Sequence, residues 1–502
     1  MGGAGPSAIA HAPDRNALPL PASFGLVMDP ATSTADGGAV LMGGAPFRLL
    51  RLSPRARTVV DRWNQGAPVG EGRAAQRLAR RLVSGGTFLP RPPPIEPATG
   101  DVTVVIPVRD RTAQLERLLT ALAGLPCVVV DDASRDARRC REVALGAGAR
   151  FVGLPVNQGP ATARNEGLAL VTTPLVAFVD SDCLPSADWL DPLRRAFDDP
   201  LVAAVAPRIV PAGGPPTTWL GAYESVQSSL DRGPTAGLVR PQSPIPYVPS
   251  AALVLRRSVA IGPALFDPRL RGGEDVDLVW RLAEAGWDVR YLPESTVLHQ
   301  GPASVPSFLS RRAFYGTSAA PLARRHGAVM APLHASAWTA AVWALLAARR
   351  PGWAGAVLAT SVLILARRLQ GLVGHPLPMA ARIAAGGTAK STLPALSGLA
   401  RAWSPALVLA FWSRRARRPA AMALLVPAVA AWGRDSGGLD PVRFATAHVA
   451  DDLAYGAGVW AGCWRERTVR PLVPRISWRA RVWSSPTLRA ALGPRATTPR
   501  GD

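Results

Sequence analysis

The sequence predicts an α/β fold: a doubly wound domain over residues 101–305, with a small α+β domain before it and a helical region after it. Two observations lead to this prediction. Short apolar runs such as Val102–Val108 are typical of strands that are buried on both faces of a parallel sheet. Segments with helical periodicity alternate with these runs, which is characteristic of α/β folds, whose sites lie at the carboxyl ends of the strands.

The chain has 502 residues, which is long for one ordinary core and predicts two or three domains. Residues 1–20 are rich in Gly, Ala and Pro, so they are expected to be disordered, and they contain no apolar stretch of the kind found in secretory signals. A small domain is expected over residues 21–90. A stiff Pro-rich linker is expected over residues 91–100.

The small domain is predicted to contain strands at Phe24–Met28, Ala39–Met42, Phe47–Leu52 and Thr87–Leu89, and helices at Pro54–Trp63 and Arg73–Val83. A turn at Asp36-Gly37-Gly38 is expected to join the first two strands. Ser53 is a predicted helix cap. This order of elements resembles the winged-helix, PqqD-like domains that recognise peptides in natural-product pathways. A structural cap on the next domain is the alternative interpretation.

In the central domain, strands are predicted at Val102–Val108, Cys127–Val130 and Leu175–Val179, and helices at Gln114–Leu122 and Ala161–Leu170. Two of these strands end in acidic residues. Asp131 and Asp132 follow one, and Asp180-Ser181-Asp182 follows another. Carboxylate oxygens are the ligands that Mg²⁺ and Mn²⁺ prefer, so the second cluster predicts a divalent metal site.

A third acidic cluster, Glu274-Asp275, follows two glycines and begins a predicted helix. The glycines would let the backbone approach a ligand closely, although capping of the helix is the alternative role for these acids. Arg164 could pair with a phosphate or be an ordinary helix residue, and His299 could be a metal ligand or a surface histidine.

The C-terminal region, residues 306–502, is predicted to be helical, apolar and rich in arginine. Its uncharged runs are Val329–Ala348, Gly352–Ala366, Pro405–Trp412 and Pro419–Gly433. Only the first has the length that crosses a bilayer of about 30 Å. Tryptophans in or beside these runs favour membrane association over buried helices of a soluble domain.

The formal net charge is +22, and nearly all of the positive charge is arginine. The arginines occur as pairs beside apolar runs, such as Arg349–Arg350 and Arg367–Arg368. That arrangement suits an anionic membrane surface better than a nucleic-acid groove, so no nucleic-acid partner is expected. The four cysteines are scattered without a CxxC pair, which argues against a zinc site or a disulfide framework.

Taken together, these segments resemble the family-2 glycosyltransferases of the GT-A fold over about residues 101–300. The matching segments are Thr103–Asp110, Val130–Ser134, Gly159–Asn165, Asp180–Asp182, Glu274–Arg281 and Val297–His299. The resemblance implies transfer of a sugar from a UDP-sugar donor with the help of Mg²⁺ or Mn²⁺. In such a reaction a metal neutralises the leaving diphosphate and a base deprotonates the acceptor hydroxyl.

The resemblance also implies roles for individual residues. Those expected to bind the nucleotide-sugar are Pro107, Asp110, Asp131, Asp132, Arg164 and Asp180. Asp182 is the expected direct metal ligand, with Asp180 and His299 in the same shell. Asp275 matches the usual general base, and Glu274 stands beside it. The Gln-x-x-Arg-Trp motif of processive cellulose- and chitin-synthase relatives is absent from the sequence.

Over its whole length the chain resembles the glycosyltransferases of the mycofactocin system, on the small N-terminal domain, the central domain, the segment Tyr315–His326 and the apolar C-terminal part. That resemblance implies inverting, β-linked transfer of glucose to a small peptide-derived redox cofactor, at the cytoplasmic face of the cell membrane or in the cytoplasm. A lipid or cell-wall polysaccharide acceptor is the alternative within enzymes. A peptide-binding scaffold with an inactive transferase domain is the alternative of another class.

Overall fold

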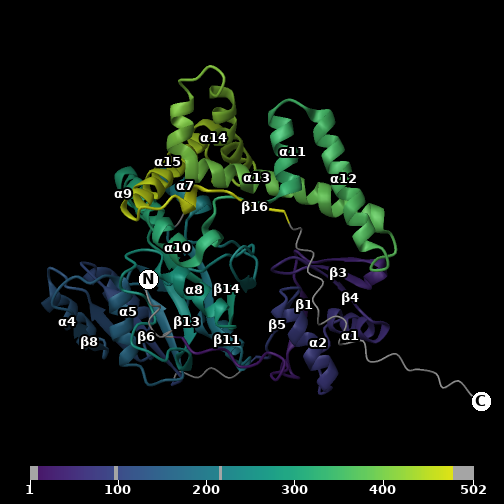
Figure 1. The fold of residues 1–502 in the computed structure, drawn as a ribbon. Coiled ribbons are helices and arrows are strands. Elements are labelled where there is room, and N and C mark those ends of the chain that lie inside the picture. The colour runs from purple at the N-terminus through teal and green to yellow at the C-terminus, as the bar shows by residue number, and fades with distance from the viewer. Residues whose placement is uncertain (1–8, 95–99, 214–217, 479–502) are drawn as a thin grey trace, which may run out of the picture.

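The computed structural model describes residues 9–94, 100–213 and 218–478. The central sheet and its helices lie at the lower left and centre of Figure 1, and the small N-terminal domain lies at the lower right. The C-terminal helices α11 to α15 form a separate layer above both (Figure 1).

The central sheet has the strand order β10-β14-β11-β13-β9-β6-β7-β8, and β12 (Gly237–Val239) pairs with β14. The predicted parallel half is confirmed in β6 (Val102–Val108), β7 (Cys127–Asp131), β8 (Arg150–Gly153) and β9 (Leu175–Val179). Parallel strands end at the same edge, so this half brings the first two acidic clusters to one side.

The other half of the sheet is mixed, which the sequence did not predict. Here β13 (Ala252–Arg256) runs antiparallel to both β9 and β11 (Val202–Pro211). The long β14 (Asp288–His299) is parallel to β11 and antiparallel to β10 (Cys183–Pro185). His299 is therefore the last residue of a strand of 12 residues.

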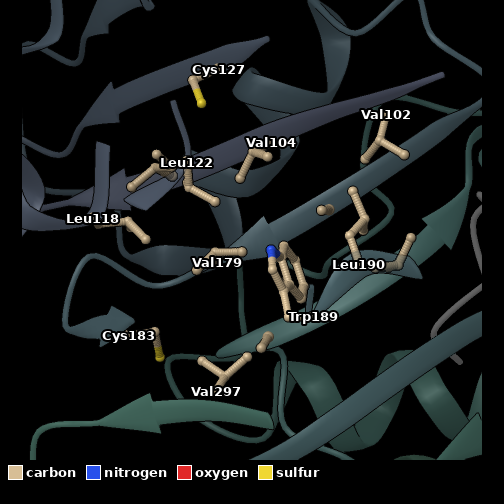
Figure 2. Packing of buried hydrophobic residues seen from close by; sticks show 14 of the residues in the cluster. Val102, Val104, Leu118, Leu122, Cys127, Val179, Cys183, Trp189, Leu190 and Val297 are labelled. Carbon is tan, nitrogen blue, oxygen red and sulfur yellow. The ribbon is translucent and has the colours of Figure 1, made fainter. Parts of the chain in front are cut away.

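Side chains that alternate along β6 build a core on each face of the sheet, as expected for a strand buried on both sides. Val102 and Val104 pack with α3 (Thr112–Ala121), α4 (Ala137–Gly146) and α6 (Leu190–Arg195) on one face. Figure 2 shows this face, where Leu118 and Trp189 lie among the strand valines.

On the opposite face Val105 packs with α5 (Pro160–Ala169) and α8 (Glu274–Glu284). A short helix, α7 (Trp219–Gln227), precedes β12 and packs toward the C-terminal layer. Because α5 and α8 cover one face of the sheet, their N-terminal ends lie near the edge that carries the acidic clusters.

The N-terminal domain contains α1 (Pro54–Asn64), α2 (Arg73–Ser84) and two small sheets. Its strand pairing differs from the prediction. The strand that faces β3 (Val40–Gly43) across the Asp36–Gly38 turn is β2 (Ser33–Ala35), which the sequence analysis missed, and β4 (Arg48–Arg51) lies on the other side of β3. The expected first strand, β1 (Gly25–Met28), instead pairs with β5 (Phe88–Arg91).

The predicted disorder of residues 1–20 is wrong for the part that the structure describes, which begins at residue 9. Ile9 is only 2% exposed, and the Trp287 indole donates a hydrogen bond to the Ala10 carbonyl at 2.6 Å. Arg15 forms an ion pair with the buried Asp288 at 2.8 Å. Burial of one large apolar side chain and pairing of a buried acid outweigh the flexible composition of this segment. Residues 1–8 of the predicted disordered segment lie outside the described residues, and so do residues 95–99 of the predicted linker.

The C-terminal layer follows α9 (Val305–Thr317) and α10 (Ala319–His326) and consists of α11 (Ala337–Ala347), α12 (Pro351–Leu369), α13 (Pro376–Ala410), α14 (Arg417–Trp432) and α15 (Pro441–Arg465). The run Val329–Ala348 was predicted to have spanning length, and that prediction is wrong. Only its last part is helical, because a 3₁₀ turn (Gly327–Met330) and β15 (His334–Ser336), which pairs with β16 (Arg475–Ser477), come first. In the described chain, α12 and α13 are the two helices whose length and composition would suffice to cross a membrane.

Buried contacts join the N-terminal domain to its neighbours. Arg80 of α2 pairs with Asp199 of the central domain at 2.7 Å, and both side chains are almost fully buried. On its other side, Val40 and Met42 of β3 pack against Leu369, at the end of α12. The domain therefore bridges the central domain and the C-terminal layer.

Candidate active site

A cleft of about 1240 Å³ opens at the carboxyl ends of the parallel strands. Most of the residues that the sequence singled out line it: Pro107, Asp132, Arg164, Asp180, Asp182, Glu274, Asp275 and His299. Asp110 and Asp131 are not among the lining residues. The C-terminal region closes the opposite wall, so the cleft belongs to both parts of the chain.

Asp182 and His299 lie side by side because β10 and β14 pair through Cys183 and His299. The Asp182 Oδ2 atom is 3.5 Å from His299 Nε2 and also forms an ion pair with Arg111. Burial alone would raise the pKa of Asp182, but the hydrogen bond and charge of His299 and the positive charge of Arg111 lower it to about 2. Asp182 is therefore ionised at every physiological pH.

This pair fits a divalent metal. A carboxylate oxygen and an imidazole nitrogen reach the same point on the cleft wall, and Mg²⁺ or Mn²⁺ commonly takes one or two protein ligands and completes its shell with substrate phosphates and water. Among the described residues no cluster of three or more acidic, histidine or cysteine side chains could hold a metal.

Asp180 has a different partner. Its Oδ1 atom is 2.6 Å from Arg164 Nη2, while Arg164 Nη1 is 2.9 Å from Glu274 Oε1. Arg164 is 3% exposed, so its charge is neutralised by these two acids rather than presented freely to a phosphate. The expected direct role of Asp180 as a metal ligand, and of Arg164 as a phosphate ligand, stay predictions.

Glu274 and Asp275 begin α8, directly after Gly273. Gly273 has a φ of +77°, and a Cβ atom there would lie 2.9 Å from Leu322 and 3.1 Å from Ser318, so only glycine fits this tight turn. Burial, and then the charge of Asp275, raise the pKa of Glu274 to about 7, although Arg164 opposes the shift. Burial also raises the pKa of Asp275. Two acids with raised pKa values in one cleft are suited to proton transfer near neutral pH.

The C-terminal region holds α8 in place. Asp277, one turn into the helix, accepts from Arg281 at 2.7 Å and lies 3.0 Å from His326 Nε2 of α10. Hydrogen bonds to Asp277 and Glu284 outweigh burial and raise the pKa of His326 to about 9. The imidazolium of His326 thus connects α10 to the helix that carries the acidic pair.

The first acidic cluster shapes the neighbouring loops. Asp132 accepts hydrogen bonds from the Asn157 side chain at 2.8 Å and from the backbone of Gln158 and Gly159 at 2.7 and 2.9 Å. Asp131 accepts from Ser134, and Asp110 accepts from the Arg135 backbone at 2.8 Å. These bonds fix the loops that surround Pro107, and direct contact of the three acids with a nucleotide stays a prediction.

Comparison with known proteins decides the family. The model of Glycosyl transferase family 2 matches residues 103–261. The pre-mycofactocin glycosyltransferase of Mycobacterium tuberculosis (strain H37Rv) is 40% identical over 471 residues, which cover 91% of this chain and 98% of that protein. The chain belongs to the mycofactocin-system family-2 glycosyltransferases. The confirmed expectations are the family, with the GT-A fold that membership implies, and the transferase activity.

Two solved structures show partial likeness to this glycosyltransferase. A mannosyltransferase from Pyrobaculum calidifontis, solved with GDP-Man and Mn²⁺, is 21% identical and covers 68% of this chain and 89% of its own, with a TM-score of 0.35. TarS 1–349 from S. aureus is 20% identical and covers 44% of this chain and 65% of its own, with a TM-score of 0.33.

The sequence analysis of this glycosyltransferase missed several residues of the cleft. Arg111 follows the matched Thr103–Asp110 segment and contacts Asp182. Asp451 and Asp452 line the opposite wall. The sequence could have indicated them, because burying two adjacent acids in an apolar helical segment costs free energy unless they are paired or bind a ligand.

Proposed function

We propose that this glycosyltransferase transfers glucose from UDP-glucose to pre-mycofactocin, with inversion and a β linkage. The relative that carries this substrate in its name is 40% identical over nearly its whole length, and that observation supports the acceptor. The donor sugar, the linkage and inversion rest on the family resemblance.

The donor would lie on the sheet side of the cleft, with its diphosphate toward Asp182 and His299. A bound Mg²⁺ or Mn²⁺ would neutralise the charge that develops on the leaving diphosphate. Asp182 suits this position because it stays ionised, and Arg111 beside it adds positive charge at the same point.

On the other side of the donor, Asp275 would accept the proton of the acceptor hydroxyl. Inversion requires a carboxylate on the face opposite the leaving group that is not bound to metal. Asp182 contacts His299 and Arg111, and Glu274 forms an ion pair with Arg164. Asp275 is the acid of this group that has no ion-pair partner among the described residues. Its hydrogen bond from the Val276 backbone at 2.8 Å fixes the carboxylate at the start of α8.

We also infer attachment to the cytoplasmic face of the membrane. Trp353 and Trp412 are 65% and 79% exposed on the C-terminal layer. Exposed aromatic rings beside paired arginines match the chemistry of an anionic lipid surface. The PqqD-like peptide-recognition role of residues 21–90 stays a prediction.

The test incubates the purified enzyme with UDP-glucose, Mn²⁺ and pre-mycofactocin and detects the product by mass spectrometry. A mass increase of one hexose, lost on treatment with a β-glucosidase, is the expected result. Transfer from GDP-mannose but not from UDP-glucose would reject the donor. No transfer to pre-mycofactocin by an enzyme that still hydrolyses UDP-glucose would reject the acceptor.

A lipid or cell-wall acceptor is the second candidate, because the exposed apolar surface of the C-terminal layer could bring the cleft close to a membrane. The same assay with a membrane lipid extract in place of pre-mycofactocin separates the two. Sugar incorporated into the organic phase alone would favour the lipid acceptor.

A further inference from the structure

A cluster of charged side chains lies on the wall of the cleft that the C-terminal region forms. Asp451 and Asp452 come from the middle of α15, Arg401 from α13 and Arg312 from α9. All four line the same cavity as Asp275. None of them takes part in the donor or base chemistry described above.

Ion pairs connect this cluster across four helices. Arg312 Nη2 is 2.6 Å from Glu224 Oε1 on α7, and Arg312 Nε is 3.1 Å from Asp451 Oδ1. Arg401 Nε is 3.2 Å from Asp452 Oδ1. Since these contacts draw side chains from separate elements to one point, the carboxylates are held in fixed positions.

Two carboxylate oxygens of the cluster are buried without a hydrogen bond among the described residues: Asp451 Oδ1, which keeps its ion pair with Arg312, and Asp452 Oδ2. Asp452 is 3% exposed, and its Oδ2 atom has no hydrogen-bond partner among the described residues. His448 Nε2 lies 3.9 Å away, beyond hydrogen-bond distance. Buried polar atoms almost always have a partner, so a buried oxygen on a cavity wall indicates a place for a ligand group or a water.

The charge of the cluster indicates what kind of group would bind. Three carboxyl groups, Glu224, Asp451 and Asp452, face two guanidinium groups, Arg312 and Arg401. Because the cluster has more carboxyl than guanidinium groups, it favours a ligand that donates hydrogen bonds. Burial raises the pKa of Asp452 to about 7. This carboxyl group therefore does not require a positively charged ligand, and it can accept a hydrogen bond from a neutral N–H or O–H group.

The size of the cleft agrees with a second substrate. At about 1240 Å³ it exceeds the roughly 300–1,000 Å³ of a pocket for one small ligand. Asp182 and His299 lie on the sheet side, and Tyr455 of α15 adds an aromatic ring on the side of the cluster. The cavity therefore has a donor end and a separate end with different chemistry.

We propose that Asp451 and Asp452 form the acceptor subsite, where they bind an N–H or O–H group of the acceptor remote from the hydroxyl that receives the sugar. The proposal rests on the proposed function for the choice of acceptor. It assigns the C-terminal region, outside the matched family-2 segment, a direct part in acceptor specificity.

The experiment compares Asp452→Ala and Asp452→Asn with the wild-type chain, using pre-mycofactocin as acceptor. Arg443→Gln is the matched control, because Arg443 is a charged and largely exposed residue of the same helix. We expect Asp452→Ala to raise the KM for the acceptor about tenfold or more, because a hydrogen bond to a charged group is lost. Asp452→Asn keeps an oxygen acceptor and should raise the KM about threefold. UDP-glucose hydrolysis without acceptor, and donor affinity by calorimetry, should stay within about twofold of the wild type in all variants.

An unchanged acceptor KM in Asp452→Ala would overturn the subsite. An equal loss of donor hydrolysis and transfer would also overturn it, because that pattern indicates a structural role. If the alanine variant does not fold, the asparagine variant decides by the same two readings. If the wild type hydrolyses UDP-glucose but leaves pre-mycofactocin unmodified, the proposed function fails by itself, and the KM comparison is made with the lipid acceptor that incorporates sugar.

Discussion

At the scale of single residues, the acids of the cleft differ mainly in their partners. Asp182 contacts His299 and Arg111, which keep it ionised. Glu274 is buried against Arg164 and has a pKa raised to about 7. Carboxyl groups of the same cleft can thus differ in protonation state, because the neighbours of each carboxyl group decide whether it holds a proton.

The first prediction concerns the role of Asp182 as a ligand of the divalent metal. Asp182→Asn removes the carboxylate charge next to His299, so we expect transfer to decrease about a hundredfold or more while the thermal midpoint changes little. Chelation should abolish transfer in the wild type, and added Mn²⁺ or Mg²⁺ should restore it. Asp191→Asn, at a half-buried acid on α6 away from the cleft lining, is the control. Full activity in excess chelator would contradict the metal role.

The acidic pair on α8 also predicts a pH dependence. A general base acts only when it is ionised, and burial raises the pKa of both Glu274 and Asp275. We therefore expect kcat/KM to be full at about pH 8 and to decrease at lower pH as the raised pKa values of the pair, about 7 for Glu274, are passed and the carboxylates become protonated. Rates measured in overlapping buffers at constant ionic strength provide the check. A profile that stays flat down to about pH 5 would show that no group of this kind limits the reaction.

At the scale of elements, the close approach of α9 and α15 positions both ends of the cleft. A Cβ atom at Gly458 of α15 would clash with the Ala313 carbonyl of α9. The same approach lets Arg312 of α9 reach Asp451 of α15. Small residues at this crossing thus connect the proposed acceptor wall to the helices that hold α8.

We therefore expect Gly458→Ala to lower the free energy of unfolding by about 2 kcal/mol and to reduce transfer, because the two helices must separate. Gly387→Ala on α13 is the matched control. A Cβ atom there meets nothing within 4 Å, so this change should be neutral or should stabilise by up to about 1 kcal/mol. Urea unfolding of both variants gives the comparison, and equal stability of the two would contradict the packing argument.

The elements also show what the sequence could predict. Strands β6, β7 and β9 were predicted almost to the residue, because a continuous apolar run bounded by polar residues has one good interpretation in an α/β chain. The mixed half of the sheet was missed, since the direction of a strand depends on partners distant in sequence. The pairing of β1 with β5 was missed for the same reason.

The candidate site was predicted in part. The acidic clusters at strand ends were found because their position follows from sheet topology. The pairing of Arg164 with both Asp180 and Glu274 could not be read from the sequence, since residues 164 and 274 are far apart in the chain. Asp451 and Asp452 were missed because the apolar character of the C-terminal region was read as membrane contact alone.

At the scale of the whole molecule, three parts of the chain support one cleft. The central domain supplies the acids, the C-terminal region closes the cleft, and the N-terminal domain is anchored to both. Asp199 is fully buried against Arg80 and Arg290. Removal of the N-terminal domain would therefore leave a buried acid with one partner fewer and expose apolar surface on α12.

Membrane attachment is tested on the whole chain. Four exposed arginines, Arg414, Arg415, Arg417 and Arg418, follow the exposed Trp412. We expect binding to vesicles of phosphatidylglycerol and phosphatidylcholine, and a loss of about tenfold or more when the four arginines are changed to glutamine. The matched control changes Arg135, Arg138, Arg139 and Arg141 to glutamine, which removes equal charge from the central domain. Equal weakening in both variants, or no sedimentation of the wild type with vesicles, would contradict attachment through this surface.

The measurement that tests the account most directly is made on Asp275. Asp275→Asn keeps the shape of the side chain but cannot accept a proton, so turnover should decrease by about 10²–10⁴-fold. Affinity for UDP-glucose, measured by calorimetry on the same protein, should stay nearly unchanged, since the base acts mainly in the transition state. Normal turnover in Asp275→Asn together with an inactive Glu274→Gln would assign the base to Glu274. Normal turnover in both variants would contradict the account, because the acidic pair would then only cap α8.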